Sequence, residues 1–550
     1  MRSNLRESKR PLRLFATTLV IGFLFHAAYA DRKERSIESW QPTHFDISIS
    51  LNDTLSELTS AKADITVLIR KKDTEVVDLD FGNMPVSAVT VDGATAKFTQ
   101  HDEKLDVFLP HAARLLQRVV ISVTYAGTPK DGLILVKDKE GIPSAIGDNW
   151  PDRVHNWIPC LDHPSAKSSV RFTVTAPSRN AVVANGKLES RKDNSNATTT
   201  WVWNETHNVS PYNMVIAAGQ FATGDLKAGL PLPISYYVTH TDGQFADRGF
   251  SSASDSVQLF SRLVGSYPYD KLALIVGATR FGGMENANTI VFTPGLFRNF
   301  DSASPRSDRY KIPSGVESVV AHEIAHQWFG DAVTESTWAD LWLSEGFATY
   351  FAGLFIEANE GKDAFRAYMS KNSESYFQFE KKNRRPLHDV QTEKLMDLLN
   401  PNNYEKGSWV LHGLRGMLGD AAFFRGLKRY YEANNGKTAT SETLRASLEA
   451  ASGKNLQNFF DRWVYQSGHP VYSISWTAAG RGIIDVKLVQ SQPDEAFLMP
   501  VTIEIITKTG TKRLSVTPRS KELKLRIRSA DPTKIVVDPD DFILKEVVAQ

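Results

Sequence analysis

The stretch H-E-I-A-H at residues 322–326, followed by Glu345, decides the fold and the chemistry of this 550-residue chain. Residues four apart on a helix lie one turn above each other on the same side, so His322 and His326 can bind one metal ion. Glu345 adds an oxygen ligand and leaves a fourth position for water, which is the ligand set of a catalytic zinc site. Glu323 is placed to take a proton from that water. The pattern predicts metal-assisted hydrolysis of an amide bond.

The residues around the two histidines predict an amphipathic helix. An apolar residue recurs every four positions, at Val316, Val320, Ile324 and Trp328. At 100° per residue the histidines lie about 200° from this stripe, and they therefore face away from the core. Ser314 and Glu317 have the spacing of a capping box, and Gly330 is expected to end the helix. The alternative, a surface helix with scattered polar residues, does not account for the stripe.

A second helix is predicted to carry the third ligand. Residues 338–350 form a mostly apolar segment that contains Glu345. An acidic side chain is costly to bury in such a segment without a partner, and a cation would be that partner. The alternative is a carboxylate that is hydrogen-bonded to the backbone, but the spacing from His326 favours the metal ligand.

These segments together resemble the M1 family of zinc aminopeptidases, in which H-E-x-x-H is followed after eighteen residues by a glutamate within L-x-E-G-F-A. A second motif also resembles the family, whose G-x-M-E-N sequence corresponds to Gly282, Gly283, Met284, Glu285 and Asn286. The resemblance implies that this segment binds the substrate and that Glu285 binds its free α-ammonium group. A buried carboxylate that pairs with a cation would select a charged N-terminus over an internal peptide bond.

A third segment, residues 403–407, is similar to the family's Y-x-K-G sequence. The resemblance implies that the hydroxyl of Tyr404 stabilises the oxyanion of the tetrahedral intermediate, where charge develops during the reaction. Taken alone, Tyr404 would more often be a packing residue than a catalytic one. Its position relative to the zinc motif favours the catalytic role.

A fourth segment, residues 149–164, resembles the F-P-C-F-D-E-P region of the family's N-terminal domain, with His163 in place of the usual acidic residue. Many members carry a glutamine or glutamate just before this region, which helps to hold the substrate amine. Neither residue type occurs between Gly141 and Pro159. Asp148 and Asn149 both stand near the expected place, and Asp148 is chosen as the expected second ligand of the amine.

The resemblance implies a zinc-dependent aminopeptidase that acts on peptides with a free N-terminus and binds one zinc ion. Zinc lowers the pKa of its bound water towards about 7, Glu323 deprotonates that water, and Glu323 then returns the proton to the leaving amine. Three alternatives stay open: a thermolysin-like endopeptidase, a non-catalytic binding module on a decayed peptidase scaffold, and an epoxide hydrolase, an activity known from one branch of the family.

Residues 1–30 are predicted to be a signal peptide. Basic residues precede the uncharged, mostly apolar residues 14–25, and a small-x-small cleavage site follows at residues 28–30. The uncharged run is shorter than the roughly 20 residues of a membrane span, although an uncleaved anchor is the alternative. We expect an exported protein, periplasmic or secreted, without a stable membrane span after cleavage. The formal net charge of +1, without a basic block after residue 30, gives no indication of nucleic-acid binding.

The remaining chain is too long for one hydrophobic core, and its patterns predict an α+β multidomain protein. Alternating runs such as residues 45–51 and 170–174 predict a β-rich N-terminal domain over residues 31–226. Helical patterns at residues 411–418 and 443–448 lie in a zinc catalytic domain over residues 227–470, and alternation returns in residues 471–550. The resemblance implies a thermolysin-like catalytic domain followed by a small β-sandwich, without the helical C-terminal domain of many members.

Overall fold

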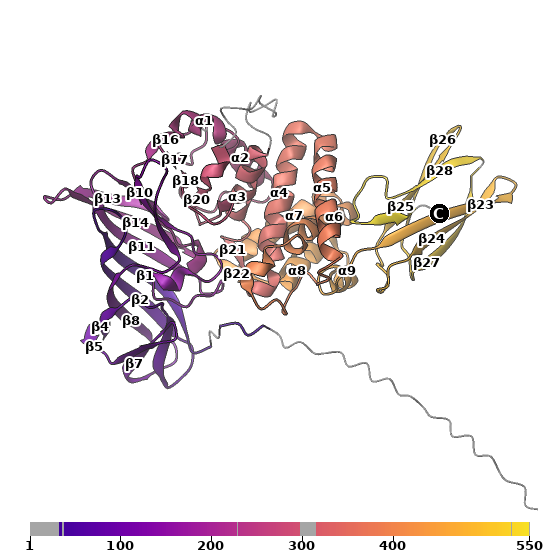
Figure 1. Ribbon diagram of the computed structural model, residues 1–550. Coiled ribbons are helices and arrows are strands. Elements are labelled where there is room, and N and C mark those ends of the chain that lie inside the picture. The colour runs from indigo at the N-terminus through magenta and orange to yellow at the C-terminus, as the bar shows by residue number, and fades with distance from the viewer. Residues whose placement is uncertain (1–31, 36–37, 228, 298–314, 530, 549–550) are drawn as a thin grey trace, which may run out of the picture.

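The computed structural model describes residues 32–35, 38–227, 229–297, 315–529 and 531–548. The predicted signal peptide and Ser314 lie outside these ranges. Three parts follow one another along the molecule: β-sheets at the N-terminal end, helices in the middle and strands at the C-terminal end (Figure 1). The prediction of a mixed α+β architecture is confirmed. Among the described residues, no helix combines the length and the apolar character that crossing a bilayer requires.

The N-terminal part is built on an eight-stranded sheet with the order β13-β14-β11-β1-β2-β8-β4-β5. Its outer strands are β13 (Lys187–Asp193), β4 (Val86–Val91) and β5 (Ala94–Thr95). Its central strands are β1 (Trp40–Leu51), β2 (Leu58–Ile69), β8 (Arg118–Gly127), β11 (Ser168–Pro177) and β14 (Thr198–Val209). They include the two predicted alternating runs, at 45–51 in β1 and 170–174 in β11. Buried and less buried residues alternate along these strands because one face of the sheet covers a core.

Two smaller sheets complete the N-terminal part. The four-stranded sheet contains β12 (Ala181–Ala184), β15 (Ile216–Gly219), β10 (Pro143–Gly147) and β9 (Leu133–Lys137), in that order. The three-stranded sheet contains β3 (Thr74–Asp80), β7 (Lys104–Ala113) and β6 (Phe98–His101). Residues of all three sheets belong to one continuous hydrophobic core.

A five-stranded sheet connects the N-terminal part to the helices. Its order is β16 (Ala222–Asp225), β17 (Ile234–Val238), β18 (Leu272–Val276), β20 (Thr289–Phe292) and β19 (Gly283–Met284). Pairing of β16 with β17 groups residues 222–225 with the middle part of the chain. The domain boundaries at residues 226 and 470 stay predictions.

The two faces of this sheet belong to different cores. Leu272 and Leu274 of β18 pack into the core of the helical part, whereas Ala273 and Ile275, which alternate with them, pack into the core of the N-terminal part. Met284 on the edge strand β19 also belongs to the N-terminal core. The sheet is therefore buried on both sides, as expected for a run of five fully buried residues in β18.

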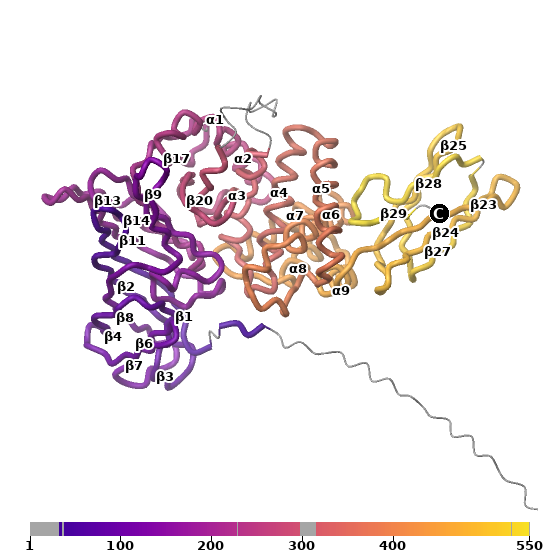
Figure 2. Tube along the Cα trace, viewed as in Figure 1, coloured from indigo at the N-terminus to yellow at the C-terminus, as the bar shows by residue number. Residues whose placement is uncertain are grey.

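The middle part is mainly helical. Its longer helices are α2 (Ala253–Leu263), α3 (Val316–His326), α4 (Trp342–Glu360), α5 (Lys362–Glu380), α6 (Gly407–Leu418), α7 (Asp420–Asn434), α8 (Ser441–Ser452) and α9 (Gln457–Trp463). The patterns predicted as helical at 411–418 and 443–448 lie in α6 and α8. Figure 2 shows α4 and α5 side by side, and α3 packs against α4.

The metal-motif helix α3 has the predicted apolar stripe, and its four residues are all buried. Its ends differ from the prediction. The N-cap is Gly315 with φ of +96° and no side-chain cap hydrogen bond, so the helix begins one residue later than a capping box of Ser314 and Glu317 requires. A residue in the left-handed region cannot be the first helical residue, which is the physical reason for the shift. The helix ends at His326, four residues before Gly330.

The C-terminal strands form a four-stranded sheet and a three-stranded sheet. The first contains β27 (Glu522–Arg528), β24 (Ile483–Gln490), β23 (Val471–Gly480) and β29 (Glu546–Val548); the second contains β26 (Gly510–Val516), β25 (Val501–Thr507) and β28 (Pro532–Val537). Their buried residues continue the core of the helical part. The alternation predicted for residues 471–550 includes residues 523–528, which lie in β27.

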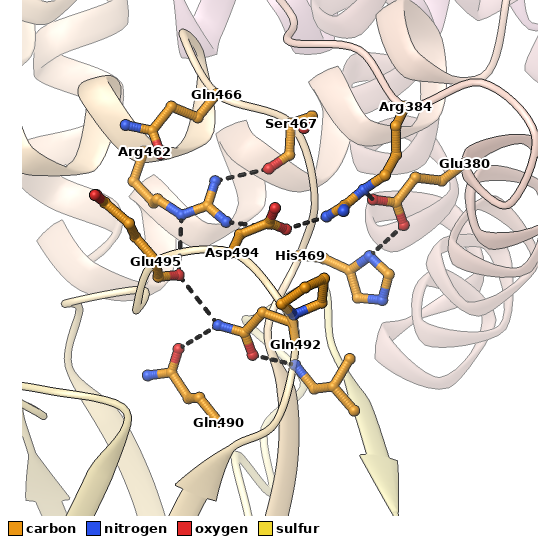
Figure 3. A network of polar contacts seen from close by, with 12 residues as sticks. Glu380, Arg384, Arg462, Gln466, Ser467, His469, Gln490, Gln492, Asp494 and Glu495 are labelled. Carbon is orange, nitrogen blue, oxygen red and sulfur yellow. Dashed lines mark hydrogen bonds and ion pairs between the residues drawn. The ribbon is translucent and has the colours of Figure 1, made fainter. Parts of the chain in front are cut away.

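A polar network links the last helices to the C-terminal strands (Figure 3). Asp494 forms ion pairs with Arg384, at the end of α5, and with Arg462 of α9. His469 contacts Glu380 through Nδ1 at 2.8 Å and Glu546 through Nε2 at 2.9 Å. Charged groups of both parts therefore meet at the junction, beside the shared apolar core.

Candidate metal centre and active site

Three side chains converge on one point between α3 and α4. The Nε2 atoms of His322 and His326 are 3.1 Å apart, and each lies 3.4 Å from Oε2 of Glu345. Zinc bonds of about 2.0–2.2 Å at tetrahedral angles separate two ligand atoms by about 3.3–3.6 Å. Two of the three separations lie in this range, and the distance between the two histidine nitrogens is slightly shorter. The three residues that the sequence predicts as ligands therefore lie together as a group that can hold a metal.

The chemistry of the group also fits a cation. Oε2 of Glu345 is buried and has no hydrogen-bond partner among the described residues, which is costly for a carboxylate without a positive ion. Burial alone raises the pKa of Glu345, but the positive charge of His326 and the contacts with both histidines outweigh it and lower the pKa to about 2. The ionised carboxylate is the form that a metal needs.

The ring of His326 is held from behind by the turn that follows α3. Its Nδ1 lies 3.2 Å from the carbonyl oxygen of Phe329 and 3.1 Å from Oγ of Ser344. Donation from Nδ1–H to the carbonyl leaves the lone pair of Nε2 free for a metal. Gly330, with φ of +123°, makes this turn possible, because a Cβ there would lie 2.5 Å from Ser344 Oγ.

Glycines bring Tyr404 to the metal ligands. Tyr404 lies in a π-helical turn, Asn402–Lys406, that leads into α6. A Cβ on Gly346, the residue after Glu345, would lie 2.8 Å from Cα of Gly407, so α4 and the start of α6 touch backbone to backbone. The Tyr404 ring stacks on His322 with 6.0 Å between centroids and 5° between planes. Burial and the nearby Glu345 raise the pKa of Tyr404 well above its usual value, so its hydroxyl stays a donor.

Glu323 lies between the helix and the G-x-M-E-N segment. A Cβ on Gly283 would lie 2.3 Å from the Glu323 carboxyl carbon, so only glycine allows this approach. Burial raises the pKa of Glu323 to about 8; His326 opposes the shift, while Glu285 and Glu345 add to it. A carboxyl of this kind can accept and return a proton near neutral pH.

Glu285 is the second carboxylate that faces the histidines. One of its oxygens lies within 4.8 Å of a carboxylate oxygen of Glu323 and of a ring nitrogen of His326. Burial raises its pKa to about 7, with His326 opposing the shift and Glu345 adding to it. A cationic group bound between Glu285 and Glu323 would offset this crowding of negative charge. Glu285 is suited to that role because it has no ion pair among the residues that the structure describes.

The other residues of the G-x-M-E-N segment have supporting positions. Gly282 and Gly283 line the cavity over the histidines. Met284 pairs with Val291 of β20 and is buried on the far side, and Asn286 is fully buried. The segment therefore presents the backbone of its two glycines to the cavity, while its buried side chains fix it to the sheet.

Asp148 contacts other groups in the structure. Its Oδ2 lies 3.2 Å from Nη2 of Arg153 and accepts a hydrogen bond of 3.2 Å from the backbone N–H of Arg280, and its Oδ1 accepts one of 3.4 Å from Thr279. These contacts support the loop before Gly282. A role of Asp148 as second ligand of the amine stays a prediction.

A cavity of about 350 Å³ opens over the metal ligands. Seven of the predicted residues line it: Gly282, Gly283, His322, Glu323, His326, Glu345 and Tyr404. Glu285, Met284, Asn286 and Asp148 are not part of the lining, which is completed by Trp150, Phe281, Ser318, Val319, Tyr368 and Leu399. Phe281 directly precedes the G-x-M-E-N motif, and Trp150 lies in the segment 149–164 that resembles the family. Their positions in or next to these motifs could have indicated both as site residues. Tyr368 and Leu399 come from segments without any motif, and only the tertiary structure brings them here.

Two stretches of the chain match known domains. Residues 41–213 match the peptidase M1 N-terminal domain, and residues 256–463 match the peptidase family M1 domain. Together the two matches cover more than half of the chain. The chain belongs to peptidase family M1. The second match contains the metal ligands, Glu323, the G-x-M-E-N segment and Tyr404.

Relatives within family M1 carry aminopeptidase names. The chain is 26% identical to a probable aminopeptidase 2 of Sulfurisphaera tokodaii over 86% of this chain and 60% of the relative. It is 24% identical to a leucyl aminopeptidase of Saccharolobus solfataricus, over 81% and 56%, and 27% identical to a glutamyl aminopeptidase of Rattus norvegicus, over 68% and 40%. The chain thus spans about half the length of the curated relatives it matches.

Proposed function

We propose that this chain is a zinc-dependent aminopeptidase that hydrolyses the N-terminal peptide bond of peptides. The single observation that carries the proposal is the placement of Glu285 and Glu323 within 4.8 Å of His326, beside the triangle of metal-binding atoms. A metal site alone supports hydrolysis of any peptide bond. The carboxylate of Glu285 beside it can bind a substrate ammonium group, and this favours substrates with a free N-terminus. The aminopeptidase names of the family M1 relatives agree with this activity.

His322, His326 and Glu345 would hold the zinc ion. When bound, zinc acidifies water and polarises the scissile carbonyl group. Glu345 contributes its charge in the ionised form, and the Phe329 carbonyl and Ser344 hydroxyl orient the His326 ring.

Glu285 binds the substrate ammonium group and so fixes which peptide bond lies over the histidines. Glu323 takes a proton at its carboxylate from the attacking water and returns it to the leaving amine. The Tyr404 hydroxyl donates a hydrogen bond to the oxygen of the scissile carbonyl as negative charge develops there. Trp150, Phe281 and Leu399 line the cavity with apolar surface that excludes water from the side of the bound N-terminal residue.

The proposal also includes the substrates of the enzyme and its location. Its substrates are peptides with a free N-terminus, and the predicted signal at residues 1–30 favours export to the periplasm or the medium. Processing at this site can be checked by mass spectrometry of the protein isolated from the cells that make it.

The decisive experiment measures hydrolysis of a panel of aminoacyl amides with and without a chelator, beside their N-acetylated counterparts. We expect fast cleavage of the free-amine substrates and only slow cleavage of the N-acetylated ones, with loss of activity on addition of the chelator and recovery with zinc. Equal cleavage of N-acetylated substrates would support an endopeptidase instead. No hydrolysis by the zinc-loaded protein would support a binding module.

A further inference from the structure

The side chain of Gln327, the residue directly after His326, connects the metal-binding helix to the G-x-M-E-N segment. It is fully buried. Its Nε2 donates hydrogen bonds to the backbone carbonyl oxygen of Glu285 at 3.0 Å and to Oδ2 of Asp331 at 2.8 Å. Its Oε1 accepts from the backbone N–H of Asn288 at 2.7 Å and from the hydroxyl of Tyr267 at 3.2 Å. The nitrogen and the oxygen of this one amide group therefore form hydrogen bonds with three other segments of the chain.

The orientation of this amide is fixed by its partners. The Glu285 carbonyl can only accept a hydrogen bond, and the Asn288 N–H can only donate one. The nitrogen of Gln327 must therefore face Glu285, and its oxygen must face Asn288. A flipped amide would place two acceptors against each other and two donors against each other, which is strongly unfavourable for buried groups.

The two backbone contacts of Gln327 bracket Glu285 and the turn that follows it. Asn288, at the end of this turn, has φ of +52°, and its side chain donates to Glu205 at 2.6 Å and accepts from Lys271 at 2.7 Å. The turn is thus anchored to the N-terminal part by Asn288 and to the metal-binding helix by Gln327. Among the residues that the structure describes, no other hydrogen bond joins the backbone of Glu285 to α3 or to the residue that follows it.

We infer that Gln327 is a positioning residue that sets the distance between the ammonium-binding carboxylate of Glu285 and the histidine nitrogens. The inference rests on the proposed function, because it assumes that Glu285 binds the ammonium group. A substrate held at both ends needs the two sites at one fixed separation, and an error of about 1 Å in such a separation can cost about 100-fold in rate. Gln327 thereby contributes to the preference for a free N-terminus without touching the substrate.

The test compares Gln327→Glu with the wild type. Glutamate has the same shape but offers a second acceptor where Gln327 offers a donor, so it repels the Glu285 carbonyl and Asp331 and releases the segment. We expect a roughly 30- to 100-fold loss of kcat/KM for an aminoacyl amide, with little change for the slow cleavage of its N-acetylated counterpart. The ratio of the two values is the readout, because a general loss of folded enzyme lowers both values equally. Zinc content should stay that of the wild type.

Gln490→Glu is the matched control (Figure 3). Gln490 is also buried, its Nε2 donates to the carbonyl oxygen of Phe497 at 3.0 Å, and its Oε1 accepts from the N–H of Phe497 at 2.8 Å. It lies at the end of β24, away from the metal ligands. Gln490→Glu should lose about as much thermal stability as Gln327→Glu does. It should keep the wild-type ratio of kcat/KM for the aminoacyl amide to kcat/KM for the N-acetylated amide.

Glu285→Ala separates the inference from the function on which it rests. If Glu285→Ala lowers the substrate ratio but Gln327→Glu leaves it within about twofold, the positioning role is wrong and the proposed function stands. If Glu285→Ala itself leaves the ratio unchanged, the proposed ammonium site is wrong. Should Gln327→Glu fail to fold, Gln327→Asn is measured instead, since it keeps the amide but draws it back by one methylene; an unchanged ratio there also overturns the inference.

Discussion

Gly346 and Gly407 touch each other through their backbones, so that a Cβ on Gly346 would lie 2.8 Å from Cα of Gly407. Gly346 follows the metal ligand Glu345, and Gly407 follows the turn that carries Tyr404. This contact is the reason that two segments far apart in the chain share one catalytic site. Each glycine belongs to a motif, and each is required by the other.

Gly346→Ala should therefore separate the two motifs. The added methyl group overlaps the backbone of α6, and overpacking of this kind costs about 1–3 kcal/mol of unfolding free energy. We expect that loss in urea unfolding, together with at least a tenfold drop in kcat as Tyr404 moves away, by analogy with misplacement of other catalytic groups. Gly413→Ala in α6 is the control, because a Cβ there has its nearest neighbour at 3.5 Å. Equal effects of both substitutions would contradict the argument.

Glu323→Gln should keep the metal and remove turnover. Glutamine has nearly the same shape but cannot take a proton from water, so kcat should fall by about 100- to 10,000-fold. Metal content by native mass spectrometry should equal that of the wild type, because Glu323 is not part of the triangle of ligand atoms. A glutamine variant with near-native kcat would rule out Glu323 as the base.

Tyr404→Phe removes a donor without removing the ring that stacks on His322. We expect a decrease in kcat of about 100-fold with a smaller change in KM, because the hydroxyl acts mainly on charge that develops during the reaction. Tyr125→Phe serves as the comparison. The buried hydroxyl of Tyr125 donates a hydrogen bond of 2.7 Å to the Trp157 carbonyl oxygen. Tyr125 lies in the core of the N-terminal part and does not line the cavity over the histidines. It should lower stability by about 1 kcal/mol and leave kcat intact.

Metal removal should lower thermal stability as well as activity. Without an ion, the buried Oε2 of Glu345 accepts no hydrogen bond among the described residues beyond its 3.4 Å contacts with the two histidines. The carboxylates of Glu285 and Glu323 also lie close to His326. A ligand that binds only the folded state stabilises it by about 2.7 kcal/mol at a free concentration 100 times its Kd. Scanning calorimetry should show a lower Tm after chelation and recovery with zinc. Glu345→Ala should make Tm insensitive to zinc, and a zinc response that survives this change would place the ion elsewhere.

Lys406 predicts a pH dependence of stability. Burial lowers its pKa to about 7 in the folded protein; Glu380 opposes the shift and Arg462 adds to it. Between about pH 7 and pH 10 the unfolded chain binds a proton that the folded protein does not, so the folded state gains stability as pH rises. Relative to Lys406→Met, the wild type should gain up to about 1.4 kcal/mol per pH unit in this window. Parallel curves of unfolding free energy against pH for the two proteins would show that Lys406 keeps its ordinary pKa.

The proximity of the proposed metal ligands was within reach of the sequence because helical geometry is local: the four-residue spacing of the two histidines fixes their common side in any fold. The alternating runs in β1 and the apolar stripe of α3 were predictable for the same reason. Gln327 was not, since its partners Glu285 and Asn288 lie far from it in the chain and the orientation of an amide leaves no periodic signal. Asp148 was chosen by its place in a motif, and the structure gives it Arg153 as a partner.

The five-stranded sheet that is covered on both faces has a consequence for folding. Residues of β18 alternate between two cores, so neither the N-terminal strands nor the helices can leave without exposing a fully apolar face of the same sheet. We expect one cooperative unfolding transition for both parts rather than two. A catalytic fragment cut free of its N-terminal strands should aggregate, and the predicted boundary at residue 226 is a poor place to divide the protein for expression.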